Sequence, residues 1–274
     1  MQKNKSIIDM KKIFTLFLTF CVVTFAIGQS NNLLRDVFEK KIYIDSLGTV
    51  LNYRFLTPKN YNDTTFYPLV LFLHGAGERG HDNESQLNYV DKVFGSEVFR
   101  EKFPCYVVLP QCDSAFRWCE TNWSLLRHNI PKNPSVYLSA TNQLVDSLID
   151  CLNVDISRLY ITGMSMGGFG TWDLISRYPQ KFAAAIPICG GADENMACRL
   201  KDIPIRTYHG AIDKLVKVSR TRNIVTAIRN CGGKKIYYKE YPKSGHLIWN
   251  KVYAEPGLFE WLFSQKKDIN LDYK

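Results

Sequence analysis

Metal-binding and nucleic-acid-binding patterns are absent from this 274-residue sequence. It contains neither a Cys-x-x-Cys pair nor a His-Glu-x-x-His motif, which are common spacings for zinc ligands. Basic residues are scattered, and no run of them exceeds two, whereas a nucleic-acid groove needs clustered charge. No internal repeat with a period of roughly 20–50 residues occurs, which excludes a solenoid or propeller. We therefore expect no metal site and no nucleic-acid partner.

The composition fits one large globular domain behind a leader. Hydrophobic residues make up 46% of the chain and charged residues 22%, which is enough for a substantial core. Lys11 and Lys12 precede an apolar run that ends in small residues before Gln29, which is typical of a secretory signal peptide at residues 1–28. The alternative is a membrane anchor, but the run is short for a full span and polar residues follow it. We expect an exported protein, periplasmic or extracellular, with no stable membrane insertion after cleavage.

Cysteine is moderately frequent, and its pairing is open. Seven of the eight cysteines lie beyond the leader, so one thiol must stay unpaired. An exported protein can form disulfides, and Cys112 with Cys119, and Cys189 with Cys198, are close enough in sequence to pair. Buried free cysteines that act as small hydrophobic residues are an equally good interpretation.

The most informative pattern lies at residues 158–172. A β-branched apolar run leads into Gly163-Met-Ser165-Met-Gly167, and a helix-like segment follows at 169–177. In such a strand–turn–helix arrangement, the serine is raised above the sheet with its hydroxyl near a helix N-terminus. The flanking glycines have a steric reason, because a Cβ at either would collide with the adjoining strand or helix. The pattern predicts Ser165 as a nucleophile, with an ordinary structural turn as the alternative.

Strand-like and helix-like segments alternate along the rest of the chain. Strands are expected at 41–45, 50–56, 67–73, 105–110, 183–189, 203–210 and 235–241, and helices at 136–152, 218–230 and 255–265. This order predicts an α/β fold: a mainly parallel, doubly wound sheet with an antiparallel N-terminal hairpin and helices on both faces. The predicted domain spans residues 41–267, between an N-terminal extension at 29–40 and a polar tail at 268–274.

A serine hydroxyl needs a base, usually a histidine that a carboxylate holds in one tautomer. Only His209 and His246 follow Ser165, and the order serine, acid, histidine is typical of hydrolases with this turn. Asp213 and His246 each follow a predicted strand, so we predict Ser165, Asp213 and His246 as a catalytic triad, with His209 bonded to a neighbouring loop. A turn-capping aspartate and a solvated histidine are the ordinary alternatives, and Asp202 is a weaker substitute because it precedes its strand.

The segment after the strand at 67–73 has two interpretations. Gly75 to Gly80 matches the dinucleotide fingerprint Gly-x-Gly-x-x-Gly, but polar loop residues follow it rather than a helix. We therefore favour a loop whose backbone N–H groups face an anion, with Ala76 and Met166 as the oxyanion-hole donors and no cofactor. His74 is expected to brace this loop.

Together these motifs resemble the phospholipase/carboxylesterase-type group of α/β-hydrolases. The similarity is greatest to a secreted branch often labelled "predicted peptidase", near feruloyl and acetyl-xylan esterases. It covers roughly residues 67–265 and is carried by segments 73–80, 110–112, 161–172, 187–191 and 209–213. The resemblance implies a carboxylic-ester substrate, no cofactor, and the triad Ser165, Asp213 and His246. Members often carry Asp-x-x-Val-Pro after the acid, whereas Lys217 stands here in place of the proline, which affects loop shape rather than chemistry.

We expect a secreted serine hydrolase that acts through an acyl-enzyme and removes acetyl or feruloyl groups from plant polysaccharide. Trp118 and Trp123 in the 111–135 loop motivate the polysaccharide, with core packing of these rings as the alternative. A peptidase with the same triad is the rival, although the chain has no propeller or lid domain. A non-catalytic glycan-binding protein is a third hypothesis, disfavoured because no triad residue is missing. Specificity is expected to lie in the 80–100 and 111–135 loops.

Overall fold

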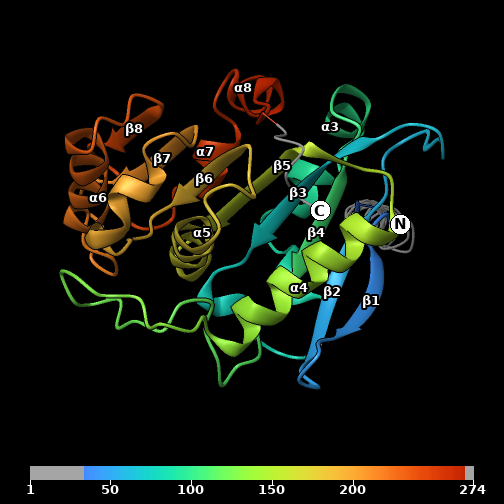
Figure 1. Cartoon of the computed structure of the whole chain (residues 1–274), viewed down its shortest axis with the longest axis horizontal. Helices are drawn as coiled ribbons and strands as arrows, with labels where there is room; N and C mark the ends of the chain where they lie inside the picture. Colours follow the sequence, from blue (N-terminus) through green and yellow to red (C-terminus); the bar gives the residue numbers. More distant parts are fainter. Residues whose placement is uncertain (1–33, 269–274) are drawn as a thin grey trace, which may run out of the picture.

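An eight-stranded, mainly parallel sheet forms the centre of the protein (Figure 1). The computed structural model describes residues 34–268. The strands, in chain order, are β1 (Glu39–Ile44), β2 (Val50–Leu56), β3 (Tyr67–Leu73), β4 (Tyr106–Pro110), β5 (Val154–Met164), β6 (Ala184–Ile188), β7 (Ile205–Gly210) and β8 (Ile236–Tyr241). The sheet order is β1-β2-β4-β3-β5-β6-β7-β8. The β1–β2 and β2–β4 pairs are antiparallel, and all other pairs are parallel. The predicted α/β-hydrolase sheet with its antiparallel hairpin is therefore confirmed.

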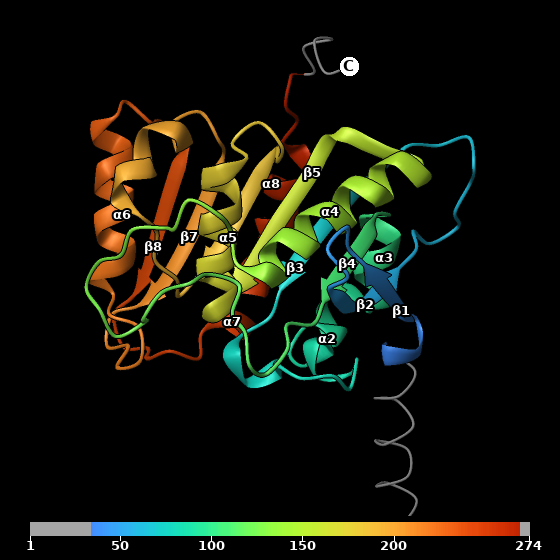
Figure 2. The same cartoon turned by 60° about the horizontal axis from the view of Figure 1, so that its bottom comes forward.

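Two helical layers cover the sheet (Figure 2). One contains α4 (Val136–Cys151), α5 (Met166–Arg177) and α6 (Ser219–Asn230), and the other contains α2 (Asp91–Phe94), α3 (Glu97–Lys102), α7 (Trp249–Tyr253) and α8 (Leu258–Ser264). Within residues 34–268, no helix combines the length and apolar character that a membrane crossing needs. The predicted signal peptide at 1–28 lies outside the described residues.

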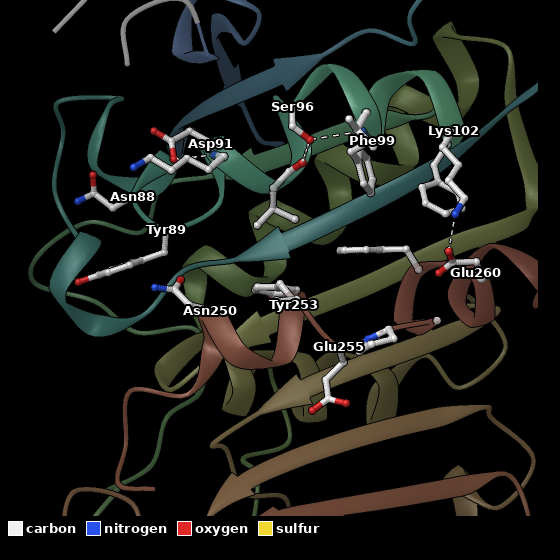
Figure 3. Close-up of a pocket in the computed structure, with 18 of the residues that line it drawn as sticks. Asn88, Tyr89, Asp91, Ser96, Phe99, Lys102, Asn250, Tyr253, Glu255 and Glu260 are labelled. Carbon is white, nitrogen blue, oxygen red and sulfur yellow. Dashed lines mark hydrogen bonds and ion pairs between the residues drawn. The ribbon is translucent and has the colours of Figure 1, made fainter. Parts of the chain in front are cut away.

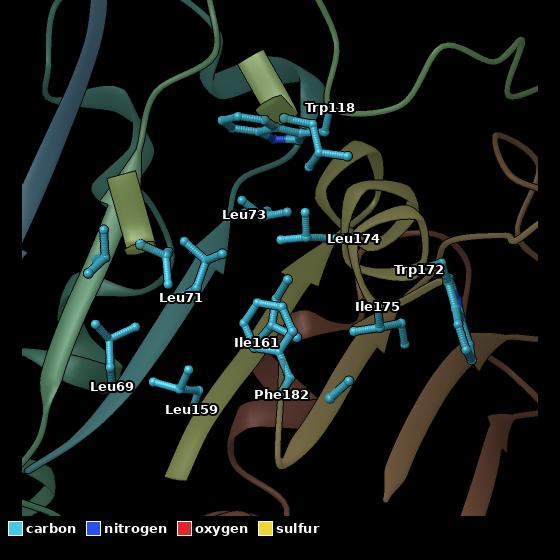
Figure 4. Close-up of a cluster of buried hydrophobic side chains, with 14 of the residues drawn as sticks. Leu69, Leu71, Leu73, Trp118, Leu159, Ile161, Trp172, Leu174, Ile175 and Phe182 are labelled. Atoms are coloured by element: carbon cyan, nitrogen blue, oxygen red, sulfur yellow. The ribbon is translucent and has the colours of Figure 1, made fainter. Parts of the chain in front are cut away.

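Alternation along β3 supplies both hydrophobic cores. Leu69, Leu71 and Leu73 belong to the core beneath α4 and α5, whereas Val70 and Phe72 belong to the core beneath the other helices. Figure 4 shows the first of these cores, in which the three leucines lie beside side chains of β5 and α5. All seven residues of β3 are buried, as expected for a strand that is covered on both faces.

Two predicted segments differ from the structure. The C-terminal helix predicted at 255–265 is shorter in the structure, where α8 covers Leu258–Ser264, because Pro256 and Gly257 precede it and Gly257 has φ +74°. The helix α7 lies before the predicted segment and was not predicted. The segment 80–100, predicted as loop, contains α2, the start of α3 and a 3₁₀ turn at Ser85–Leu87. Helices of one turn are too short to produce a detectable hydrophobic period.

Neither disulfide suggested by sequence proximity occurs. Cys198, in the 3₁₀ helix Glu194–Leu200, pairs instead with Cys231 at the end of α6, and their Cα atoms lie 5.1 Å apart. Cys112 and Cys119 are both buried and free, and they lie in separate hydrophobic clusters. The free cysteines among the described residues are Cys105, Cys112, Cys119, Cys151 and Cys189.

Candidate active site

The serine of the Gly-x-Ser-x-Gly motif lies on a sharp turn between β5 and α5. Ser165 has φ +54° and ψ −117°, a strained conformation for a residue other than glycine. Its N–H donates to the carbonyl of Ile188 in β6 at 2.9 Å, which anchors the turn to the neighbouring strand. The side chain stays partly exposed while the residues around it are buried. The turn therefore presents the Ser165 hydroxyl at the carboxyl edge of the sheet.

Steric crowding explains the glycines of this turn. A Cβ on Gly163 would lie 2.4 Å from the carbonyl oxygen of Gly167, and a Cβ on Gly167 would lie 1.9 Å from the carbonyl oxygen of Leu73. Both distances are far shorter than a van der Waals contact. Backbone contact between the turn and the end of β3 therefore requires glycine at these positions.

Three side chains predicted from the sequence form one hydrogen-bonded chain. His246 Nε2 lies 2.7 Å from Ser165 Oγ, and His246 Nδ1 lies 2.6 Å from Asp213 Oδ2. They come from the ends of β5, β7 and β8, which point in the same direction because these strands are parallel. An ionised carboxylate can only accept hydrogen bonds, so His246 Nδ1 carries the hydrogen that faces Asp213 Oδ2. In the neutral imidazole, His246 Nε2 is then free to accept the proton of the Ser165 hydroxyl.

The carboxylate of Asp213 is held in its ionised form. Burial disfavours the charge, but hydrogen bonds from His209, His246 and the Val216 N–H outweigh that effect and hold the pKa of Asp213 well below its ordinary value. The N–H groups of Leu215 and Val216 donate to Oδ1 at 2.8 and 2.9 Å. Asp213 therefore remains an anion at every pH at which His246 can act as a base.

The two predicted oxyanion donors have free N–H groups. Within residues 34–268, the N–H groups of Ala76 and Met166 donate to no protein acceptor. Met166 is the first residue of α5, where backbone N–H groups have no partner in the helix. The loop that contains Ala76 lies against the serine, since a Cβ on Gly75 would be 3.8 Å from Ser165 Cβ. Both donors thus lie on segments that adjoin the hydroxyl, although their role remains a prediction.

His74 braces that loop from within. The Cys112 N–H donates to His74 Nε2 at 2.9 Å, so Nδ1 carries the hydrogen that is donated to the carbonyl of Gly75 at 2.6 Å. Burial lowers the pKa of His74 to about 4, which keeps the ring neutral. Trp118 is fully buried, and its indole N–H donates to the carbonyl of His74 at 3.0 Å. Trp118 therefore supports the loop and does not face a substrate.

His209 bonds the neighbouring loop as predicted, with Nε2 3.0 Å from the carbonyl oxygen of Val216, but two other contacts of the site were not predicted. His209 Nε2 lies 3.1 Å from Asp213 Oδ2, and the thiol of Cys189 donates to the carbonyl of His246 at 3.3 Å. Cys189, Asp213 and His246 have potential ligand atoms within 4.8 Å of one another, so they are the residues that could hold a metal ion. Those same atoms make the hydrogen bonds above, and burial raises the pKa of the Cys189 thiol, which opposes its ligation.

A surface groove of about 1300 Å³ runs between α2–α3 and α7–α8 (Figure 3). Tyr89 and Asn250 lie at one end of it, and the ion pair between Lys102 and Glu260 lies at the other. The Trp249 ring connects the first end with the site, because its centre is 5.7 Å from the His246 ring and 5.5 Å from the Tyr89 ring. The groove therefore begins one aromatic ring away from His246.

Comparison with known proteins places these observations in a family. Residues 62–255 match the family described as Phospholipase/Carboxylesterase, and the chain belongs to this family of α/β-hydrolases. The resemblance predicted from the motifs is thus confirmed.

Individual relatives extend this finding. The chain is 32% identical over 130 residues to a poly(3-hydroxyalkanoate) depolymerase C of Paucimonas lemoignei, covering 45% of this chain and 28% of that protein. It is 27% identical over 163 residues to a bifunctional acetylxylan esterase/xylanase, XynS20E, of Neocallimastix patriciarum, covering 60% and 22%. The chain thus spans about a quarter of the length of these two relatives. The crystal structure of a thermostable esterase is 39% identical, with a TM-score of 0.79, over 86% of this chain and 64% of that one.

Proposed function

We propose that this protein is a serine esterase that cleaves carboxylic esters through an acyl-enzyme. The observation that carries the proposal is the continuous hydrogen-bonded chain from Ser165 Oγ through His246 to Asp213, with distances of 2.7 and 2.6 Å. Membership of the Phospholipase/Carboxylesterase family supports a hydrolase. The activity of the thermostable esterase and the acetylxylan esterase supports ester substrates in particular.

In the proposed acylation step, His246 Nε2 takes the Ser165 proton while Oγ attacks the ester carbonyl carbon. Negative charge develops on the carbonyl oxygen, and the N–H groups of Ala76 and Met166 stabilise it; one such donor is worth about 3 kcal/mol of the barrier. His246 then gives its proton to the alcohol as the bond to carbon breaks. Asp213 stabilises the imidazolium and keeps its orientation throughout.

In the deacylation step, a water molecule takes the place of the alcohol. His246 accepts a proton from this water, whose oxygen attacks the acyl carbon. The bond to Ser165 Oγ then breaks, the proton returns to Oγ, and the carboxylic acid leaves. Because the same residues serve both steps, loss of Ser165 or His246 removes the whole cycle.

The proposed substrates are acetyl or feruloyl esters of plant polysaccharide. The groove beside Trp249 supports a polymeric substrate, because it is open to solvent and lined by both polar and apolar side chains. Tyr89 lies at the end of the groove nearest Trp249 and is 45% exposed, so it offers an aromatic face on which a sugar ring can stack. We also propose export from the cytoplasm, supported by the leader-like residues 1–28 and by the Cys198–Cys231 disulfide, which persists in oxidising compartments.

A substrate panel tests this proposal. The purified protein is assayed with p-nitrophenyl acetate, acetylated and feruloylated xylan fragments, and a chromogenic peptide, in parallel with Ser165→Ala. We expect ester hydrolysis that Ser165→Ala reduces by at least about 10⁴-fold. Ester hydrolysis that survives this substitution would contradict the assignment of the nucleophile, and cleavage of the peptide alone would favour the peptidase instead.

A further inference from the structure

Asp213 contacts a second imidazole besides that of His246. His209, at the end of β7, is 0% exposed, and its Nε2 lies 3.1 Å from Asp213 Oδ2 and 3.0 Å from the carbonyl oxygen of Val216. Both neighbours of Nε2 are acceptors, so this nitrogen must carry a hydrogen. His209 therefore donates to the same carboxylate oxygen that accepts from His246.

Thr221 of α6 fixes the other side of the His209 ring. Its Oγ1 lies 2.7 Å from His209 Nδ1 and 2.8 Å from the carbonyl oxygen of Gly190. A hydroxyl has one hydrogen, so Thr221 donates either to Gly190, in which case Nδ1 also carries a hydrogen, or to Nδ1. Both arrangements leave the hydrogen on Nε2, so His209 donates to Asp213 in each.

The negative charge of Asp213 is thus shared among four donors. The N–H groups of Leu215 and Val216 occupy Oδ1, and the two imidazoles occupy Oδ2. Glu240 of β8, which pairs with His209 in register and is held by Arg222, also acts on His209. A donor at Oδ2 fixes that oxygen in position and also reduces the charge that it presents to His246.

We propose that His209 is a positioning residue that holds Asp213 Oδ2 in line with His246 and limits the basicity of His246. This inference rests on the proposed esterase function. Its signal in the sequence is the spacing of His209 and Asp213, which puts the strand-end histidine and the loop carboxylate one tight turn apart.

The test compares two amide substitutions. His209→Gln keeps an N–H that can reach Asp213, whereas His209→Asn is one methylene shorter and cannot. We measure kcat and KM with p-nitrophenyl acetate from pH 5 to 9, and the pKa of His246 by NMR.

In His209→Asn we expect kcat to fall about ten- to a hundredfold with little change in KM. We also expect the acid limb of the pH profile to move up by roughly 0.5–1 unit, because Asp213 then presents more charge to His246. His209→Gln should stay close to the parent protein in both kcat and the position of the acid limb.

Two further variants separate positioning from folding. Thr207→Val removes a buried hydroxyl on the same strand, which bonds only the carbonyl of Pro187, and should leave the pH profile unchanged. Thr221→Val loosens the His209 ring without touching Asp213. It should move the acid limb of the pH profile in the same direction as His209→Asn, but by less, and it replaces His209→Asn in the test if that variant fails to fold. Equal behaviour of the Asn and Gln variants, or lost activity with an unmoved acid limb, overturns the inference. If the parent hydrolyses no ester, the proposed function fails, and the NMR titration of His246 still tests the coupling.

Discussion

Gly167→Ala tests the packing that places the Ser165 hydroxyl. The new methyl carbon would lie 1.9 Å from the carbonyl oxygen of Leu73, and ordinary contact begins near 3.4 Å, so the turn and the end of β3 must separate by about 1.5 Å. Leu73 leads into the loop that carries Ala76, so this separation displaces one predicted oxyanion donor from the serine. A misplacement of about 1 Å costs roughly 100-fold in rate, and overpacking costs about 1–3 kcal/mol of stability.

The assay pairs kinetics with denaturation. We expect Gly167→Ala to lower kcat for p-nitrophenyl acetate by at least about 100-fold and to lower the free energy of unfolding in urea by about 1–3 kcal/mol. Gly77→Ala is the matched control, because a Cβ there meets nothing within 4 Å and its φ is not in the left-handed range. It should keep the stability of the parent or gain up to about 1 kcal/mol. A Gly167→Ala protein with parental kcat and stability would refute the steric account of the turn.

Three other predictions follow from the structure. Replacing Cys198 and Cys231 by serine opens a loop of 33 residues and should lower the free energy of unfolding by about 3–4 kcal/mol in urea titrations, with kcat unchanged. Equal stability of the parent protein with and without reductant would contradict this. Asp213→Asn should lower kcat about 10⁴-fold. Because the pKa of Asp213 is lower in the folded state than in the unfolded state, its carboxylate stabilises the fold above pH ~4 and loses that effect as the pH falls. The difference in free energy of unfolding between the parent and Asp213→Asn should therefore narrow on acidification, and a constant difference would argue against the depressed pKa. Tyr89→Ala should raise KM for xylan fragments several-fold with p-nitrophenyl acetate kinetics unchanged, and equal effects on both substrates would exclude the groove as a polymer site.

The sheet and the three candidate catalytic side chains could be predicted because local sequence determines them. Continuous apolar runs define the strands, and the order of the strands brings their carboxyl ends to one edge. Ser165 was identified because its turn requires glycine on both sides, a constraint that is visible in five consecutive residues. Asp213 and His246 followed from their positions just after strands. A position just after a strand can be recognised from the sequence without knowing any distance in the folded protein.

Features that depend on distances between remote segments could not be predicted. Cys198 pairs with Cys231 because a 3₁₀ helix lies against the end of α6, and neither segment has a pattern that indicates this contact. The contact of His209 with Asp213 depends on the curl of the loop after β7. Trp118 looked like a substrate-binding residue, but its ring is buried and its N–H is used by the loop at His74, which only packing reveals.

Labelling with a fluorophosphonate probe tests the central claim most directly, because the probe reacts only with a serine that a neighbouring base has activated. The protein and its His246→Ala variant are treated at pH 8, digested, and mapped by mass spectrometry. We predict one adduct, on Ser165, that forms in the parent and is lost in His246→Ala. A parent protein that stays unlabelled, or that carries its adduct on another serine, would contradict the assignment of Ser165 and His246 as the catalytic pair.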